Sequence, residues 1–190
     1  MDQLWIGAAI VVVVAVLAIG GWLVMSRRRR TERLTRDYGP EYRATLEATG
    51  DRGTAERELE ARRERVRALN LRPLTRDEQS AYAEEWRSAQ ARFVDDPSEA
   101  ISAADLLVQE VMRDRGYPVA DFEQRAADVS VDHPHVVSEY RAAHAIAERN
   151  ATVGVDTEQL RMALVHYRAL FSDLLETQTD EAAVAAGGSR

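Results

Sequence analysis

The feature that most restricts how this chain can fold is an uncharged apolar stretch near its beginning. From Leu4 to Met25 the chain has no charge and no proline, and most residues are Ala, Val, Ile or Leu. A helix of that length reaches about 33 Å, enough to cross a hydrocarbon core of about 30 Å. Trp5 and Trp22 lie near its ends, where indole rings favour the headgroup boundary. This stretch predicts a transmembrane helix.

The residues on either side favour an uncleaved anchor over a secretory signal peptide. A signal peptide has a basic start and an apolar run of about 7–15 residues. Here residues 1–3 carry no cation, and the apolar run is longer than that. We therefore expect a single-pass protein that keeps its first 26 residues as the anchor.

The arginines that follow predict the orientation. Arg27, Arg28, Arg29 and Arg30 come directly after the apolar stretch, whereas Asp2 is the only charge before it. Arginines close to a span stay on the cytoplasmic side, which places the N-terminus outside and residues 27–190 inside the inner membrane. The same arginines would attract anionic lipid headgroups, at about 1 kcal/mol for each Arg near the surface.

The charge of the rest of the chain is unevenly divided. Residues 27–72 carry a net charge of +5, and residues 73–190 carry −11, within a total of −7. We interpret residues 27–72 as a basic stem, 73–176 as a helical domain and 177–190 as a disordered tail. The acidic balance argues against nucleic-acid binding. The chain has no cysteine, which excludes a thiol nucleophile and thiolate-held metals.

Helical periodicity predicts an all-α fold: a transmembrane helix, a charged stem helix and a bundle of four to five helices. In the stem, residues 31–49 break at Gly39-Pro40, and residues 54–70 form a helix with a narrow apolar line. Such a line suits a stalk or short coiled coil and leaves self-association through the stem open. The line consists of Ala55, Leu59, Val66 and Leu69.

Capping patterns mark the helices of the domain. Thr75 with Glu78 forms a capping box, and Asp96-Pro97 opens the next helix, which ends near Gly116. Residues 121–128 predict a short helix, Asp132 is expected to cap a helix that starts near Pro134, and residues 150–155 are expected to be a loop. The apolar stripe of Tyr82, Trp86, Ala89 and Phe93 favours core over an exposed partner groove.

The densest polar group follows this pattern. Asp132, His133 and His135 precede Glu139 and His144, and His166 is the remaining histidine. Imidazole and carboxylate can carry protons or hold a divalent metal. The spacing matches no zincin or di-iron motif, and helix-start chemistry accounts for Asp132 and Pro134. No catalytic residue and no cofactor is assigned from the sequence.

Four segments of the chain carry a resemblance. Residues 91–97, 115–134, 140–144 and 162–171 together resemble an uncharacterised family of bacterial proteins in which one membrane helix precedes an α-helical region. The resemblance implies an anchored helical protein and no particular activity.

The leading hypothesis is therefore an inner-membrane protein that presents a cytoplasmic helical domain to a protein partner. Loops and helix starts concentrate exposed groups, so we expect the binding surface between residues 115 and 144. The alternative hypothesis is a membrane-anchored enzyme that uses the Asp132, His133 and His135 group, with or without a divalent metal. The candidate binding residues are Tyr117, Asp121, Arg125, Asp132, His133, His135, Glu139 and His144.

Overall fold

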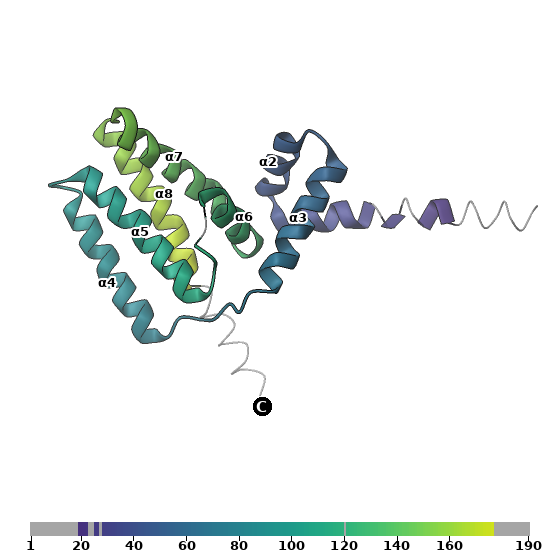
Figure 1. Cartoon of the computed structure of the whole chain (residues 1–190), viewed down its shortest axis with the longest axis horizontal. Helices are drawn as coiled ribbons and strands as arrows, with labels where there is room; N and C mark the ends of the chain where they lie inside the picture. Colours follow the sequence, from purple (N-terminus) through teal and green to yellow (C-terminus); the bar gives the residue numbers. More distant parts are fainter. Residues whose placement is uncertain (1–18, 23–24, 27, 120, 177–190) are drawn as a thin grey trace, which may run out of the picture.

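The structure, a computed structural model, describes residues 19–22, 25–26, 28–119 and 121–176. Within these residues every regular element is a helix and no strand occurs, so the expected all-α class is confirmed. After a helix over residues 28–38, the elements are α2 (Pro40–Thr49), α3 (Arg52–Arg67), α4 (Arg76–Arg92), α5 (Pro97–Arg115), α6 (Phe122–Asp132), α7 (Val137–Val153) and α8 (Thr157–Glu176) (Figure 1).

Three expectations fall wholly or largely outside this description. Most of the apolar stretch over residues 4–25, together with Arg27 and the expected tail over residues 177–190, is not among the described residues. In the part of the chain that is described, no helix has both the length and the apolar character that a membrane crossing requires. The transmembrane helix therefore stays a prediction from the sequence.

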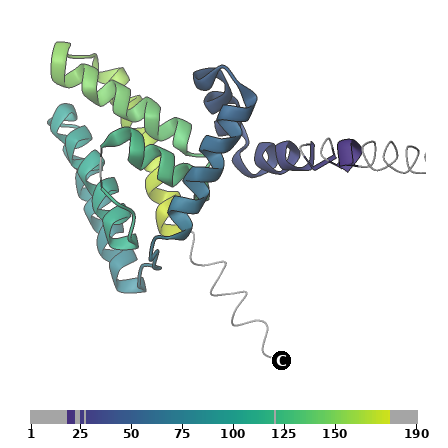
Figure 2. The same cartoon turned by 45° about the vertical axis from the view of Figure 1, so that its right-hand side comes forward.

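The main core lies among α4, α5, α7 and α8, with α6 packed at one end (Figures 1 and 2). Apolar residues of α5 and α8 are buried there, among them Ile101, Val108, Leu164 and Leu170. Trp86 of α4 stacks on Phe171 of α8 with ring centroids 4.6 Å apart, and only 5% of Trp86 is exposed. The stripe on α4 is thus core, as its helical spacing predicts.

A second, smaller core belongs to the stem. Leu34 and Tyr38 on helix 28–38 pack against Tyr42 of α2 and Leu59 of α3, and all four side chains are buried. The Tyr38 hydroxyl also donates to the Leu59 carbonyl at 2.9 Å. The narrow apolar line is therefore covered within the chain rather than left free: Ala55, Leu59 and Val66 are buried, and Leu69 packs against the main core.

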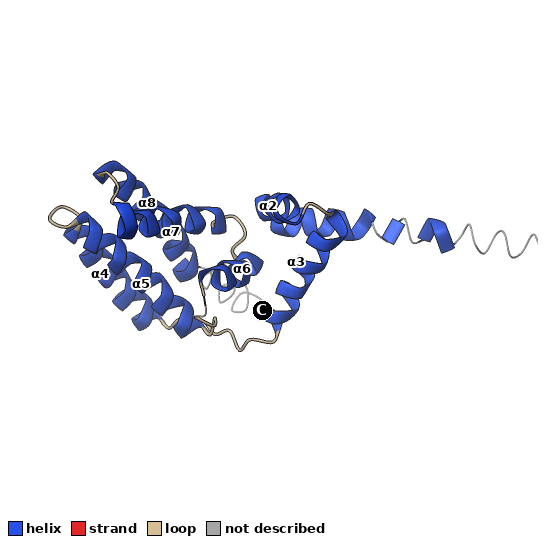
Figure 3. Cartoon of the chain, turned by 45° about the horizontal axis from the view of Figure 1, so that its top comes forward, coloured by secondary structure: helices blue, strands red, loops and turns tan. Residues whose placement is uncertain are grey.

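The stem lies beside α6 of the bundle (Figure 3). Charged side chains connect the two. Glu41 of α2 has only 3% of its side chain exposed and accepts from Arg62 of α3 at 2.7 Å. Arg141 of α7 donates to both oxygens of Glu41, at 2.6 and 3.0 Å. Arg65 of α3 reaches Asp128 of α6 at 3.1 Å. We call Glu41, Arg62 and Arg141 the Glu41 network; it holds three helices together.

Several helix ends follow the expected capping chemistry. Thr75 and Glu78 form the reciprocal capping box of α4, and Asp96 accepts from the Glu99 amide at the start of α5. Gly116 ends α5 in the left-handed region at φ 96°. A Cβ at Gly116 would lie 2.6 Å from the Asn70 carbonyl oxygen, so only glycine fits where the stem returns to the bundle.

The boundaries around α6 and α7 differ from expectation. α6 continues to Asp132, and the His133 amide still donates to the Val129 carbonyl, so Asp132 is the last residue of α6 and not a cap of α7. The helix stops there because the residue before a proline disfavours helical geometry. α7 extends through the expected loop to Val153, where Gly154 ends it by donating to the Asn150 carbonyl.

The Glu41 network predicts a large loss of stability on Glu41→Gln. The substitution removes the shared carboxylate and leaves the buried guanidinium of Arg62 with one partner fewer, which costs about 3 kcal/mol. Glu58→Gln is the matched control, since Glu58 also pairs with Arg62 but is largely exposed, and we expect about 0.5 kcal/mol. Urea unfolding of the full chain in detergent measures both. Equal losses of unfolding free energy in the two variants would contradict the stabilising role of the Glu41 network.

Candidate functional site

The structure brings part of the sequence-predicted group together where α5, α6 and α8 end. We call the following residues the His133 cluster: Arg115, Tyr117, Asp132, His133, His135 and Asp173. The positive φ of Gly116 directs the chain back at the end of α5, and the end of α6 delivers Asp132 and His133. The last turns of α8 bring Asp173 to both histidines.

His133 is held on both ring nitrogens. Its Nδ1 bonds to a carboxylate oxygen of Asp173, and its Nε2 lies 3.4 Å from Nη1 of Arg115. A guanidinium has donors only, so Nε2 must accept and the proton must reside on Nδ1, from which it is donated to Asp173. Arg115 Nη1 also donates to the Leu174 carbonyl at 3.0 Å. With 1% of its side chain exposed, His133 acts as an internal tie between three helix ends.

Asp173 is ionised and shared by two histidines. His135 Nε2 lies 3.0 Å from its second oxygen, and His135 itself is exposed. Partial burial raises the pKa of Asp173, but the hydrogen bonds of His133 and His135 lower it by more. The pKa of Asp173 therefore lies below the ordinary aspartate value. The carboxylate therefore stays charged throughout the neutral range.

Tyr117 completes the cluster from the other side. It is 2% exposed and donates its hydroxyl to Asp132 at 2.7 Å. Burial and the neighbouring Asp132 carboxylate raise the pKa of Tyr117 well above its ordinary value. The phenol therefore remains protonated and serves as a hydrogen-bond donor, not as a base.

The other candidate residues lie elsewhere. Arg125 is buried and donates to the Tyr140 hydroxyl at 3.2 Å. Glu139 contacts His166, so these two form a separate pair. The four histidines thus do not converge: only His133 and His135 meet, on Asp173.

Asp121 and His144 lie on the exposed face of α6 and α7. Asp121 caps α6 by accepting from the Gln124 amide at 3.0 Å. His144 stacks on Phe122 with ring centroids 3.6 Å apart, and its Nε2 lies 3.4 Å from Glu148. These two are the candidate residues that an incoming partner can reach on this face.

Sequence reasoning missed Asp173 and Arg115. Asp173 carried a signal: it is an acid in the last turns of α8, where the helix dipole disfavours negative charge, and buried Phe171 and Leu174 flank it. An acid in that position needs a cationic or donating partner. Arg115 carried none, because a basic residue in the last turn of α5 is common on an exposed surface.

The arrangement offers little to an enzyme. His133 has no free nitrogen, Tyr117 holds its proton, and both are buried. Within the described ranges, no three His, Asp or Glu side chains are placed to hold a metal ion. At His133 a metal ion is excluded because the guanidinium of Arg115 lies against Nε2, the nitrogen that a cation would have to approach.

A cavity of about 430 Å³ lies on the face of α6 and α7. We call it the α6/α7 cavity. Arg141 is neutralised by Glu41, whereas neither Asp121 nor Glu123 makes an ion pair with any described residue. The cavity thus has an acidic rim beside an aromatic pair. Its lining is Asp121, Phe122, Glu123, Arg141, His144, Ala145 and Glu148.

Comparisons with protein-family models, curated proteins and solved structures find no match for this chain. The resemblance carried by residues 115–134 and the three other segments gains no support from them. The functional argument therefore rests on the geometry of the described residues.

Asp173 makes stability depend on pH. Its folded pKa lies below the unfolded value of about 4, so its contribution is complete above that value and is lost as the pH falls through the folded pKa. We expect Asp173→Asn to cost about 2 kcal/mol at pH 6, and the difference from wild type to shrink below about pH 4.

The measurement is the free energy of unfolding in urea between pH 3 and pH 7. Asp156→Asn is the matched control, because Asp156 caps α8 through the Gln159 amide and asparagine caps equally well. If the wild-type protein were more stable than Asp173→Asn by the same amount at every pH, the prediction that ionised Asp173 stabilises the fold would be contradicted.

Proposed function

We propose that this chain is a single-pass inner-membrane protein whose cytoplasmic helical domain binds a basic segment of a partner protein. The observation that carries the proposal is the α6/α7 cavity, in which an acidic rim surrounds a stacked aromatic pair. The anchor over residues 4–25 and the orientation rest on the sequence, as does attraction of anionic lipid by Arg27 to Arg30.

The chemistry of the cavity favours a cationic side chain as its occupant. Asp121 and Glu123 supply negative charge without a basic partner among the described residues, and Glu148 adds a third carboxylate. The ring of Phe122 is already stacked on His144, and the guanidinium of Arg125 lies 5.8 Å from its centroid. An incoming arginine would therefore bind through the carboxylates, to which a guanidinium can donate two hydrogen bonds at once. A partner segment that carries arginine therefore fits best.

The stem supports presentation of this surface. Helix 28–38 is packed into the second core and the Glu41 network ties that core to α7, so no loose linker lies between residue 28 and the cavity. A membrane-held domain with a fixed attachment shows its cavity to partners in a restricted range of orientations. We propose that this positions the cavity toward a partner at or near the membrane.

The enzyme hypothesis has no comparable support. It relied on the Asp132, His133 and His135 group, in which His133 is buried and bonded on both nitrogens. The interaction hypothesis instead uses Asp121 and His144 of the candidate residues, because these line the α6/α7 cavity. Alanine variants of the buried Tyr117, Arg125 and His133 would test folding rather than binding.

The anchor predicts that the protein resists alkaline carbonate extraction. Val13→Arg together with Val14→Arg should release it into the supernatant, since each central arginine costs about 2.5–3.5 kcal/mol on insertion. Val13→Leu together with Val14→Leu keeps the apolar character and should stay with the membrane. Release of the wild-type protein under the same conditions would contradict the anchor.

The cavity predicts that binding depends on its three carboxylates. Asp121→Asn, Glu123→Gln and Glu148→Gln together should reduce affinity for an arginine-containing peptide about tenfold, while the helical circular dichroism persists. Asparagine at position 121 retains the cap of α6, so the variant loses charge and little else. The probe is a labelled library of short arginine-containing peptides, read by fluorescence anisotropy.

The control variant removes the same charge from the far side of the bundle. Glu84→Gln, Glu99→Gln and Asp95→Asn are exposed changes on α4, on α5 and between them, and should leave peptide affinity unchanged. An equal loss in both triple variants would mean that only net charge matters. No binding by the wild-type protein to any peptide of the library would contradict the proposed function.

A further inference from the structure

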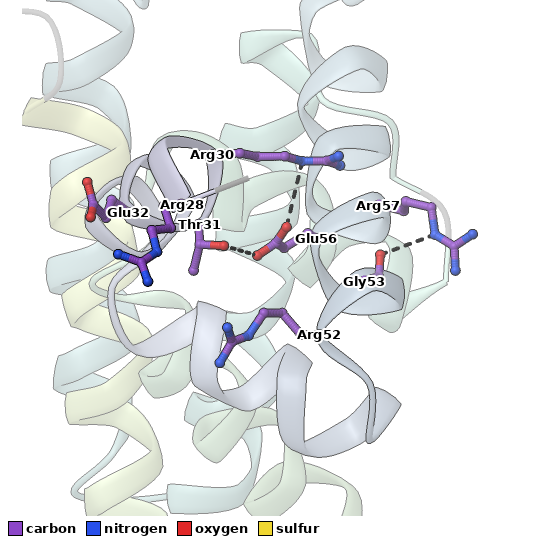
Figure 4. A pocket seen from close by; sticks show the side chains of 8 residues that line it. All are labelled: Arg28, Arg30, Thr31, Glu32, Arg52, Gly53, Glu56 and Arg57. Carbon is purple, nitrogen blue, oxygen red and sulfur yellow. Dashed lines mark hydrogen bonds and ion pairs between the residues drawn. The ribbon is translucent and has the colours of Figure 1, made fainter. Parts of the chain in front are cut away.

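A second cavity, of about 860 Å³, opens between helix 28–38 and the start of α3. Arginines dominate its lining: Arg28 and Arg30 come from the first helix, and Arg52 and Arg57 from the second. Figure 4 shows Arg28 to the left of Thr31 and Arg52 below the Thr31–Glu56 pair, whereas Arg57 lies on the other side of α3. We call this space the arginine pocket.

A buried carboxylate, that of Glu56, forms part of the wall of the pocket. Glu56 of α3 accepts from the Thr31 hydroxyl at 2.6 Å and from the Tyr42 hydroxyl at 3.2 Å, and Arg30 lies 3.8 Å away. These contacts fix the register of helix 28–38 against α3. Because Arg28 and Thr31 are three residues apart, they share a helix face, and both line the same pocket as Arg52 at the start of α3.

Two of these arginines have no partner for their charge. Neither Arg28 nor Arg52 makes a hydrogen bond or an ion pair with any residue that the structure describes. Arg57 is bonded to Gly53 and Thr54 of its own helix, while Arg30 pairs with Glu60 at 2.5 Å. The pocket therefore presents two unpaired guanidinium groups.

The carboxylates in the lining do not cancel this charge. Glu56 is 10% exposed and already engaged by Thr31, Tyr42 and Arg30. Glu32 is exposed, and Figure 4 shows it directed away from the Thr31–Glu56 pair. Unpaired guanidinium groups at a cavity recognise phosphate through paired charge-assisted hydrogen bonds.

We propose that the arginine pocket binds one phosphate group, that of an anionic lipid headgroup. Arg28 lies three residues beyond Met25, which places it about 4.5 Å along a helix from the end of the apolar stretch. That is the depth of the headgroup layer, which adds about 5–7 Å to each side of the hydrocarbon core. The lipid source rests on the proposed anchor, whereas the phosphate chemistry rests on the pocket alone.

Binding in a pocket can be distinguished from general attraction by a basic stretch, because the two require different residues. General attraction counts every arginine near the surface alike, so Arg29 would matter as much as Arg28. The pocket needs Arg28 and also Arg52, which lies outside the basic stretch over residues 27–30 and reaches it only through the fold.

The test compares two double variants of the full-length protein with the same net charge. Arg28→Gln with Arg52→Gln removes the two unpaired guanidinium groups, and Arg29→Gln with Arg67→Gln removes two exposed ones on the same helices, outside the lining. Each protein is extracted in mild detergent from bilayers of phosphatidylcholine with phosphatidylglycerol. Native mass spectrometry then counts the phosphatidylglycerol molecules retained.

We expect the wild-type protein and the control variant to retain one phosphatidylglycerol, and the pocket variant to lose about tenfold in occupancy. Equal losses in both variants, or no loss in either, would overturn the pocket. All four arginines are exposed, so circular dichroism should show the same helix content in each protein.

A second arm separates the two sources of phosphate. Inorganic phosphate is added to the lipid-free protein in detergent, and thermal unfolding is followed. Stabilisation that requires Arg28 and Arg52, without retained phosphatidylglycerol, would overturn the lipid source in favour of a soluble phosphate. The proposed anchor is tested by a different experiment: if it is wrong, alkaline carbonate releases the wild-type protein from the membrane.

Discussion

The packing of this chain depends on one buried carboxylate. Glu41 lies between the guanidinium groups of Arg62 and Arg141, and each of the three residues belongs to a different helix. A carboxylate removed from water is costly unless it is paired and hydrogen-bonded, so helices α2, α3 and α7 must meet in the one arrangement that supplies both arginines. Apolar contacts build the two cores, and Val131 of α6 packs against the smaller one. The Glu41 network, together with the Arg65–Asp128 pair, connects the stem to the bundle.

The polar groups of the bundle divide into an internal set and an external set. The buried part of the His133 cluster is internal: Arg115 and His133 bond to neighbouring helix ends, and Asp173 also reaches the exposed His135. These contacts specify where α5, α6 and α8 end, and they leave His133 without a free ring nitrogen. The α6/α7 cavity is external and keeps Asp121 and Glu123 unpaired with respect to the described residues. The proposed binding surface is therefore the part of the bundle whose carboxylates make no ion pair with a described residue.

Much of the helical architecture followed from local signals. Thr75 with Glu78, Asp96 with Pro97, and Gly116 each mark a helix end by chemistry confined to a few residues, and the spacing of Trp86 and Ala89 predicted their burial. The end of α6 was predicted wrongly. Asp132 is a residue type that often caps a helix, but here its carboxylate accepts a hydrogen bond from Tyr117, which is 15 positions away. The partners of the candidate site were harder still: Asp173 lies 40 positions from His133, and Arg141 lies 100 from Glu41. No periodicity links residues so far apart, since only the packed helices bring them together.

The burial of Leu34 and Tyr38 also has a mechanical consequence. Helix 28–38 does not end in a free hinge; it is wedged into the second core, and the Glu41 network couples that core to α7. A change in the tilt of this helix is therefore carried through α3 to the bundle, and the α6/α7 cavity swings with it. Arg141 belongs both to the Glu41 network and to the lining of the α6/α7 cavity, so the cavity adjoins the contact through which the stem and the bundle are coupled.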